Sequence, residues 1–374
     1  MEFKKIKGVI FISNVNKALE HEWFCEFVDK GEFELEFILF NSNKSELYNF
    51  ITKSGFKCKN YSLKSKFFIP FYVMFFYFKL VVHKYDFVHC HLFEASLIGL
   101  ISGKWAGIRK RIHTRHHADF HHIYFPKAVK YDLLINRYST QIIAVSNNIR
   151  SILVEKELVD INKIAVIPHG IPLSVINKQV PAEKIESIRV KYGLDLNHPV
   201  IGVVSRFTEW KGIQYIIPAF KKLIEEYPKA KLVLANAQGD YSTQLSILLK
   251  EVPNGSYILI PFENQMNALF KNFDVFVHTP IDSNCEAFGQ VYIEALCLNV
   301  PMVCTLSGIA NDLIINEENA IVVPYKNSDE IYCALKKLLT DGELRNRIIR
   351  NGNVAVQKFS FEKKYEKLKQ LYLS

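Results

Sequence analysis

The chain has 374 residues, of which 49% are hydrophobic and 23% are charged, a composition typical of soluble globular proteins with two or three domains. Its seven cysteines are scattered and include no C-x-x-C pair, which argues against a disulfide or zinc framework and favours a reducing compartment. Residues 1–180 contain 25 Lys and Arg against 16 Asp and Glu, and residues 181–374 contain 22 of each, so the net charge of +9 lies on the first half.

The N-terminal stretch MEFKKIKGVIFIS has an apolar run of about five residues, shorter than the roughly 7–15 residues of a signal-peptide core. We therefore predict that this run is a first buried strand. Elsewhere, no run approaches the ~18 uninterrupted apolar residues of a membrane-spanning helix.

Short apolar, β-branched runs alternate with helical stretches along both halves, as in parallel sheets covered by helices. They predict strands at 8–13, 35–41, 87–91, 111–114, 142–146 and 164–168, and then at 200–206, 231–236, 257–260, 274–279, 301–305 and 320–324. The fold class is therefore α/β, with two doubly wound domains at 1–180 and 181–357. We expect the last helix, 358–374, to pack back on the first domain, and ligands to bind in a cleft between the domains.

An aromatic segment, Lys64–Lys84, lies in the basic first half, and eight of the twelve residues from Phe67 to Phe78 are aromatic. It predicts either a helix buried in the core or an interfacial helix whose aromatic side chains enter a lipid headgroup layer. Both hold if only one face packs inward. The positive charge suits nucleic acid or an anionic membrane. Because no nucleic-acid motif is present, we favour a membrane surface or an anionic lipid substrate.

Two cations lie where a phosphate could bind in the second half. In VIGVVSRFTEWKG a strand ends at Arg206, and Lys211 and Gly212 open the next helix. A strand end beside a helix N-terminus is a common phosphate site. The alternative is a pair of ordinary surface cations.

Two glutamates, Glu286 and Glu294, frame the sequence EAFGQVYIE. Glu286 is predicted in the loop after a strand, and Glu294 about one and a half turns into the following helix. Buried carboxylates need partners, and sugar or ribose hydroxyls could supply them. The alternative is one carboxylate at a helix start and one paired with a distant cation.

This combination resembles the retaining glycosyltransferases of family four, which have the GT-B fold of two Rossmann-like domains facing across a cleft. The resemblance rests on the cations followed by EAFGQVYIEALCLNVPMV, and on YDFVHCH, IIAVSNNIR and IAVIPHGI in the same order. It covers nearly the whole chain. Where relatives often have glycine after the motif helix, this chain has Asn299, which tolerates a left-handed backbone.

The resemblance implies a role for each matched residue. Arg206 and Lys211 would hold the donor diphosphate and stabilise the leaving group. Glu286 with the backbone of 287–289 (Ala287, Phe288 and Gly289) would bind the donor sugar, and Glu294 the ribose. No metal or other cofactor is expected, because cations can stabilise the diphosphate and the chain has no Asp-x-Asp pair.

A histidine-rich segment, RIHTRHHADFHH, gives a competing indication. Its imidazoles could bind a transition metal, or they could lie on a surface loop. By resemblance His116 is the active-site histidine, with His117 the second choice. It would contact the donor sugar near the reacting carbon or orient the acceptor.

The sequence therefore predicts a cytoplasmic retaining glycosyltransferase, either free or peripheral on the cytoplasmic face of a membrane. It would move a sugar from a nucleotide diphosphate sugar to a glycan or lipid-linked acceptor in surface polysaccharide assembly, with no nucleic-acid partner. The alternatives are a nucleotide-sugar epimerase of the same fold and a non-catalytic carbohydrate- or metal-binding protein.

Overall fold

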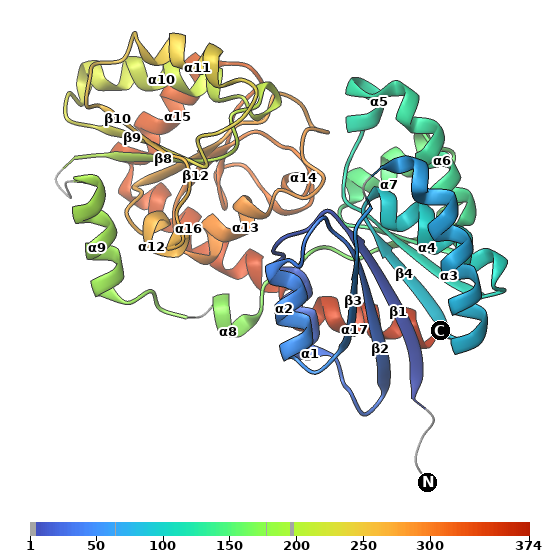
Figure 1. The fold of residues 1–374 in the computed structure, drawn as a ribbon. Coiled ribbons are helices and arrows are strands. Elements are labelled where there is room, and N and C mark those ends of the chain that lie inside the picture. Colours follow the sequence, from blue (N-terminus) through green and yellow to red (C-terminus); the bar gives the residue numbers. More distant parts are fainter. Residues whose placement is uncertain (1–4, 64, 177, 195–197) are drawn as a thin grey trace. The chain divides into compact units, whose positions relative to one another are not determined.

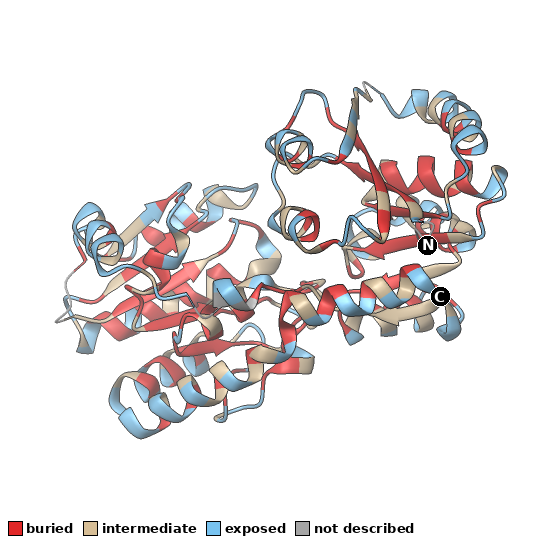
Figure 2. Cartoon of the chain, turned by 90° about the horizontal axis from the view of Figure 1, so that it is seen from below, coloured by how far each residue is buried: buried red, intermediate tan, exposed pale blue. Residues whose placement is uncertain are grey.

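The computed structural model describes residues 5–63, 65–176, 178–194 and 198–374. The chain divides into two compact units, the first made of Met1–Pro172 with Phe359–Ser374 and the second of Leu173–Lys358. Each unit contains one parallel sheet with helices on its faces (Figure 1). The inner strands of both sheets are buried (Figure 2), as expected for parallel sheets, whereas the edge strands are partly exposed.

The sheet of unit 1 has the order β3-β2-β1-β4-β5-β6-β7. Its strands are β1 (Ile6–Ser13), β2 (Phe33–Phe40), β3 (Lys57–Tyr61), β4 (Phe87–His91), β5 (Lys110–Arg115), β6 (Gln141–Ala144) and β7 (Ile164–Val166). All six runs predicted in the first half form strands. The sequence analysis missed β3, an edge strand of five residues that reads KCKNY and has no apolar run.

The helices of unit 1 are α1 (Leu19–Phe27), α2 (Glu46–Lys53), α3 (Ile69–His83), α4 (Phe93–Trp105), α5 (Phe120–Tyr124), α6 (Val129–Tyr138), α7 (Asn147–Glu155) and α17 (Phe361–Leu373). The C-terminal α17 belongs to this unit. Its side chains Phe361, Tyr365 and Tyr372 join the core cluster of Phe24 and Phe87. Unit 1 is therefore completed by the end of the chain.

Unit 2 has the sheet order β10-β9-β8-β11-β12-β13. Its strands are β8 (Val200–Val204), β9 (Lys231–Ala235), β10 (Tyr257–Ile260), β11 (Val275–His278), β12 (Met302–Cys304) and β13 (Ile321–Val322), and all six predicted runs form them. Its helices are α8 (Leu173–Ile176), α9 (Ala182–Tyr192), α10 (Ile213–Glu226), α11 (Ser242–Leu249), α12 (Met266–Phe270), α13 (Gln290–Cys297), α14 (Ala310–Leu313), α15 (Ser328–Thr340) and α16 (Gly342–Val356).

Both sheets reverse their strand order at one point, between β1 and β4 in unit 1 and between β8 and β11 in unit 2. Ligands of doubly wound sheets bind outside the carboxyl ends of the strands at such a switch point. The loops after β8 and β11 are therefore the first place to look for a site in unit 2.

The aromatic segment forms the short helix η1 (Lys66–Phe68) and α3, while its first residue, Lys64, lies outside the described residues. Val73, Phe76 and Leu80, which are spaced three and four residues apart, are buried in the core of unit 1, as a helix with one inward face requires. The other face leaves Phe71 63% and Phe78 60% exposed. The structure therefore confirms burial for one face of this helix, and the membrane contact of the exposed face stays a prediction.

By length and composition alone, Lys66–His83 could cross a membrane, because its mean hydropathy is 1.4 over eighteen residues. This was not expected from the sequence, where only uninterrupted apolar runs were considered. Core helices of soluble proteins share this length and composition. Here the packed face ties α3 into unit 1, beside α4 (Figure 1).

Candidate functional site

The loop after β8 carries the two predicted phosphate-binding cations. It runs from Ser205 through the short helix η4 (Glu209–Lys211) to Gly212, where α10 begins. Gly212 has a positive φ of 74°, and an added Cβ would lie 1.8 Å from the carbonyl oxygen of Thr279. Only glycine fits there. The loops after β8 and β11 therefore lie directly against each other.

Glu286, in the loop after β11, is the centre of a small charged cluster. It is 9% exposed and forms an ion pair with Lys211. Nε2 of His278, the last residue of β11, lies 2.9 Å from Oε1 of Glu286. The backbone N–H of Glu286 donates to Ser307 Oγ at 3.0 Å. Folding thus brings together Lys211 and Glu286, which sequence analysis had connected only by resemblance.

The cluster fixes the charge of each group. Burial raises the pKa of Glu286, but Lys211 and His278 outweigh burial and bring it to about 2. Burial also lowers the pKa of His278, with Glu286 opposing. At neutral pH a lysine cation therefore holds an ionised carboxylate, and a neutral imidazole donates to it.

His278 was missed by the sequence analysis, which gave its segment, DVFVHT, only as a strand. Its Nδ1 is buried and has no hydrogen-bond partner among the described residues. The signal that could have found it is a histidine at the carboxyl end of a strand, eight residues before a motif glutamate.

Arg206 is placed differently from Lys211. It is exposed, and its guanidinium forms no ion pair with the described residues. It follows β8 by two residues, so it lies on the same loop as Lys211. The structure therefore brings Lys211, but not Arg206, to Glu286, and the guanidinium remains available for an anion.

The segment between the two glutamates forms the entry to α13. Phe288 is buried, and its carbonyl accepts the backbone N–H of Ile309 at 2.8 Å. Gly289 has a φ of 84° and caps α13, so the backbone of Ala287, Phe288 and Gly289 turns directly into the helix N-terminus. Helix N-termini favour negatively charged ligands.

Glu294 lies on the second turn of α13 and is half-buried. Burial raises its pKa, and a hydrogen bond from Gln290 opposes this only in part. No cation forms an ion pair with Glu294 among the described residues. Of the two glutamates, Glu286 thus has its partners inside the protein, whereas Glu294 has none of opposite charge.

His116, the proposed active-site histidine, follows β5 in unit 1. Its Nε2 lies 3.1 Å from Nδ1 of His91, at the end of β4, and its ring stacks on His169 with centroids 5.5 Å apart. Burial, followed by the charge of His169, lowers the pKa of His116 well below its usual value. His116 is therefore a neutral hydrogen-bonding group at the carboxyl end of the sheet.

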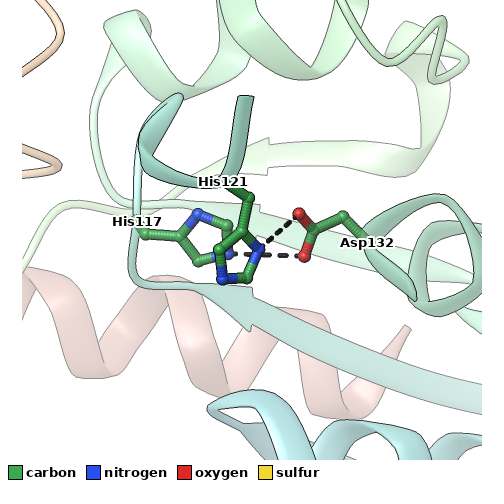
Figure 3. A group of neighbouring side chains, drawn as sticks. All are labelled: His117, His121 and Asp132. Atoms are coloured by element: carbon green, nitrogen blue, oxygen red, sulfur yellow. Dashed lines mark hydrogen bonds and ion pairs between the residues drawn. The ribbon is translucent and has the colours of Figure 1, made fainter. Parts of the chain in front are cut away.

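The second choice, His117, belongs to a different network (Figure 3). Its Nε2 lies 3.4 Å from Oδ1 of the buried Asp132, and Nδ1 of His121 lies 2.7 Å from Oδ2. The same Oδ1 is 3.3 Å from the guanidinium of Arg115, which also pairs with Glu157. Burial raises the pKa of Asp132, but the two histidines and Arg115 bring it to about 2.

The ligand atoms of His117, His121 and Asp132 all lie within 4.8 Å of one another, close enough to hold a metal ion. Two observations argue against a good metal site. Arg115 places a positive charge against the carboxylate oxygen, and Nδ1 of His117 is buried without a partner among the described residues. A metal-bound histidine usually donates its second N–H to a neighbour.

Comparisons with known proteins now assign the chain. The family described as "Glycosyl transferases group 1" matches residues 184–354, and "Glycosyltransferase Family 4" matches residues 30–175. The chain belongs to these glycosyltransferases. This family membership confirms the resemblance seen in the sequence.

Two curated relatives of this glycosyltransferase act in glycan assembly according to their names. The capsular polysaccharide biosynthesis glycosyltransferase CapM of Staphylococcus aureus is 31% identical over 63% of this chain and 61% of its own length. An Escherichia coli UDP-Gal:alpha-D-GlcNAc-diphosphoundecaprenol alpha-1,3-galactosyltransferase is 28% identical over 78% of this chain and 76% of its own. The first match thus spans less than two thirds of the relative.

Solved structures confirm the GT-B fold of the glycosyltransferase. A glycosyltransferase from Rickettsia africae has a TM-score of 0.82 at 18% identity, covering 99% of this chain and 98% of its own. Anabaena HepE in complex with UDP has a TM-score of 0.81 at 18% identity, covering 97% and 98%. At this identity the likeness concerns the fold alone.

Proposed function

We propose that this glycosyltransferase moves a sugar from a nucleotide diphosphate sugar to a glycan or lipid-linked acceptor, with retention of anomeric configuration and without a metal. The observation that carries the donor part is the buried, ionised Glu286 held by Lys211 at the carboxyl ends of β8 and β11. This is where a Rossmann-like sheet binds its ligand.

Each group of the site suits one part of such a donor. The guanidinium of Arg206 and the ammonium of Lys211 bind the diphosphate. The carboxylate of Glu286 accepts hydrogen bonds from the sugar hydroxyls, and the backbone N–H groups of 287–289 donate hydrogen bonds to them. Glu294 accepts hydrogen bonds from the ribose hydroxyls. These donors suit a carboxylate that has no cation beside it.

The reaction follows from the same charges. When the bond from the sugar to the phosphate breaks, negative charge develops on the leaving diphosphate. Arg206, Lys211 and the N-terminus of α13 stabilise that charge because they are already in place. For retention, the acceptor hydroxyl attacks the face that the phosphate leaves, and the phosphate takes its proton. His116 is proposed to contact the sugar or to orient the acceptor.

The acceptor is proposed to be a lipid-linked or other membrane-proximal glycan. The names of the two curated relatives support this class, since one acts in capsular polysaccharide biosynthesis and one on a diphosphoundecaprenol-linked sugar. Unit 1 would be the acceptor-side domain and unit 2 the domain that binds the nucleotide sugar.

The exposed face of α3 is proposed to contact the cytoplasmic face of an anionic membrane. Phe71 and Phe78 of α3 and Phe67 of the preceding η1 are each more than half exposed, and the first half of the chain carries the whole excess of positive charge. Aromatic side chains beside lysines are typical of interfacial helices. Replacing Phe71 and Phe75 with serine should abolish vesicle binding without unfolding. Unchanged binding by the folded variant would refute this contact.

The donor part is tested by thermal shifts with nucleotide diphosphate sugars, since a ligand that binds the native state raises its stability. We expect stabilisation by a matching donor in the presence of EDTA, and its loss in Lys211→Ala. Product analysis with a lipid-linked acceptor then tests transfer and anomeric configuration. Release of free nucleoside diphosphate without an acceptor product would point instead to an epimerase.

A further inference from the structure

A groove at one edge of unit 1 has no part in the proposed transfer reaction. Its volume is about 340 Å³, at the lower end of the roughly 300–1,000 Å³ typical of small-molecule sites. It lies between the end of α3 and the first residues of β1, β2 and β3. The polar and charged residues that line it are Lys7, Glu34, Glu36, Lys57, Lys59, Lys79, His83 and Tyr85.

The groove lies at the opposite end of the sheet from His116. Its residues come from the amino-terminal parts of three parallel strands, whereas His116 follows the carboxyl end of β5. A ligand in the groove would therefore not occupy the carboxyl-end position at which doubly wound sheets bind their substrates.

The charges in the groove do not balance, because four lysines face two glutamates. Glu36 is buried and is held by Lys79 and the Tyr85 hydroxyl. Glu34 forms ion pairs with Lys57, at 3.3 Å, and with Lys7, at 3.6 Å. Both of these pairs are solvent-exposed and hence weak.

Lys59 is the groove lysine that forms no ion pair with the described residues: its charge acts on Glu36, which Lys79 and Tyr85 already hold. It is exposed and lies on the edge strand β3, and its side chain forms no hydrogen bond with the described residues. A concave surface with an excess of two positive charges concentrates anions. Phosphate esters are the anions for which lysine side chains are common ligands.

The surroundings of the groove favour a lipid over a soluble phosphate ester. Lys79 and His83 come from α3, whose neighbouring side chains Phe78 and Val82 are 60% and 73% exposed. A lipid would place its phosphate among the lysines and its glycerol and acyl carbons against these side chains. A soluble phosphate ester would make no use of them.

We propose that this groove binds the phosphate of an anionic lipid headgroup. The choice of a lipid as the source of the phosphate rests on the proposed membrane contact of α3, while the phosphate site itself rests on the groove alone. The groove would hold unit 1 in a defined orientation on the membrane, which an exposed aromatic helix cannot do by itself.

The test is binding to phosphatidylglycerol vesicles without donor or acceptor. One lysine at an anionic surface contributes about fivefold to affinity, so Lys59→Gln should weaken binding about fivefold, and Lys57→Gln with Lys59→Gln about 25-fold. The matched control is Lys163→Gln, just before β7 at the opposite edge of the sheet. Six strand spacings of ~4.8 Å separate the edges, well beyond the ~8–10 Å Debye length, so the control should bind normally.

Equal losses in the Lys59 and Lys163 variants, or equal binding of wild type to phosphatidylcholine vesicles, would overturn the proposal. A second arm titrates glycerol phosphate. If it binds through Lys59 while vesicles do not bind, the groove takes a soluble phosphate and the lipid assignment is wrong. The rate of sugar transfer to a soluble acceptor should be the same in all these variants as in the wild type. Failure of wild type to bind any donor would refute the proposed transferase and leave the vesicle result unaffected.

Discussion

Replacing Lys211 with methionine removes the cation from a buried carboxylate and keeps the apolar part of the side chain. In the intact cluster the pKa of Glu286 is about 2, against an ordinary 4.5. At about 1.4 kcal/mol per pH unit, this difference stabilises the ionised native state by about 3 kcal/mol. Lys211 is the main group that lowers the pKa, against the opposing effect of burial. We therefore expect Lys211→Met to lose roughly 3 kcal/mol at pH 7, as when one partner of a buried pair is removed.

The pH dependence of this loss distinguishes the ion pair from lost packing. A carboxylate with a depressed pKa stabilises the fold above pH 4.5, and this stabilisation disappears as the pH falls towards 2. Urea unfolding followed by circular dichroism should show a difference between wild type and Lys211→Met that shrinks below pH 4.5. The double variant Lys211→Met with Glu286→Gln should recover most of the stability at pH 7. A difference that is constant from pH 7 to pH 3, or no recovery in the double variant, would refute the reasoning.

Three further outcomes are expected. Glu286→Gln should lower the rate of sugar transfer far more than the affinity for the bare nucleoside diphosphate, measured by calorimetry, because the proposed contact is with the sugar; equal losses would contradict it. Burial lowers the pKa of His21 to about 4 and of His113 to about 3. As the pH falls below 6.5, these histidines are protonated in the unfolded chain but not in the folded one, so unit 1 should lose stability. Flat urea midpoints between pH 7 and pH 4.5 would contradict this. Zn²⁺ should not raise the melting temperature through His121, because Arg115 already pairs with the carboxylate of Asp132. A rise in the wild type that is abolished in His121→Ala would establish a metal site instead.

The sequence predicted the fold closely because buried parallel strands carry their own signal. The twelve apolar runs all formed strands, and Asn299 has the left-handed φ of 57° expected of a residue that replaces glycine. The missed strand β3 lies at a sheet edge, where Lys57 and Lys59 face water and no hydrophobic pattern is required. Edge strands are the part of a sheet that periodicity describes least.

The candidate site was predicted less completely, because its geometry depends on contacts across long stretches of chain. The resemblance selected Lys211 and Glu286, but the backbone fit of Gly212 against Thr279, which brings their loops together, has no signature in sequence. His278 was overlooked for a different reason: it lies only eight residues before Glu286, but its segment was considered only as a strand. The sequence could not show which face of α3 is buried either, because the helix has aromatic residues on all its sides and no polar face.

Glu294 offers the sharpest test of how the site receives its ligand. Its carboxylate is half-buried without a cation, so burial raises its pKa, whereas Glu286 is already held ionised by Lys211. Ribose hydroxyls donate stronger hydrogen bonds to the ionised form than to the protonated form, so nucleotide binding should lower the pKa of Glu294 and release a proton wherever that group is partly protonated. Calorimetry in buffers of different ionisation enthalpy should therefore detect proton release at acidic pH, and the affinity should fall as the pH falls. Both effects should be smaller in Glu294→Gln, and what remains in the variant is the contribution of the diphosphate itself. If the variant keeps the proton release and the wild-type affinity, Glu294 does not contact the nucleotide.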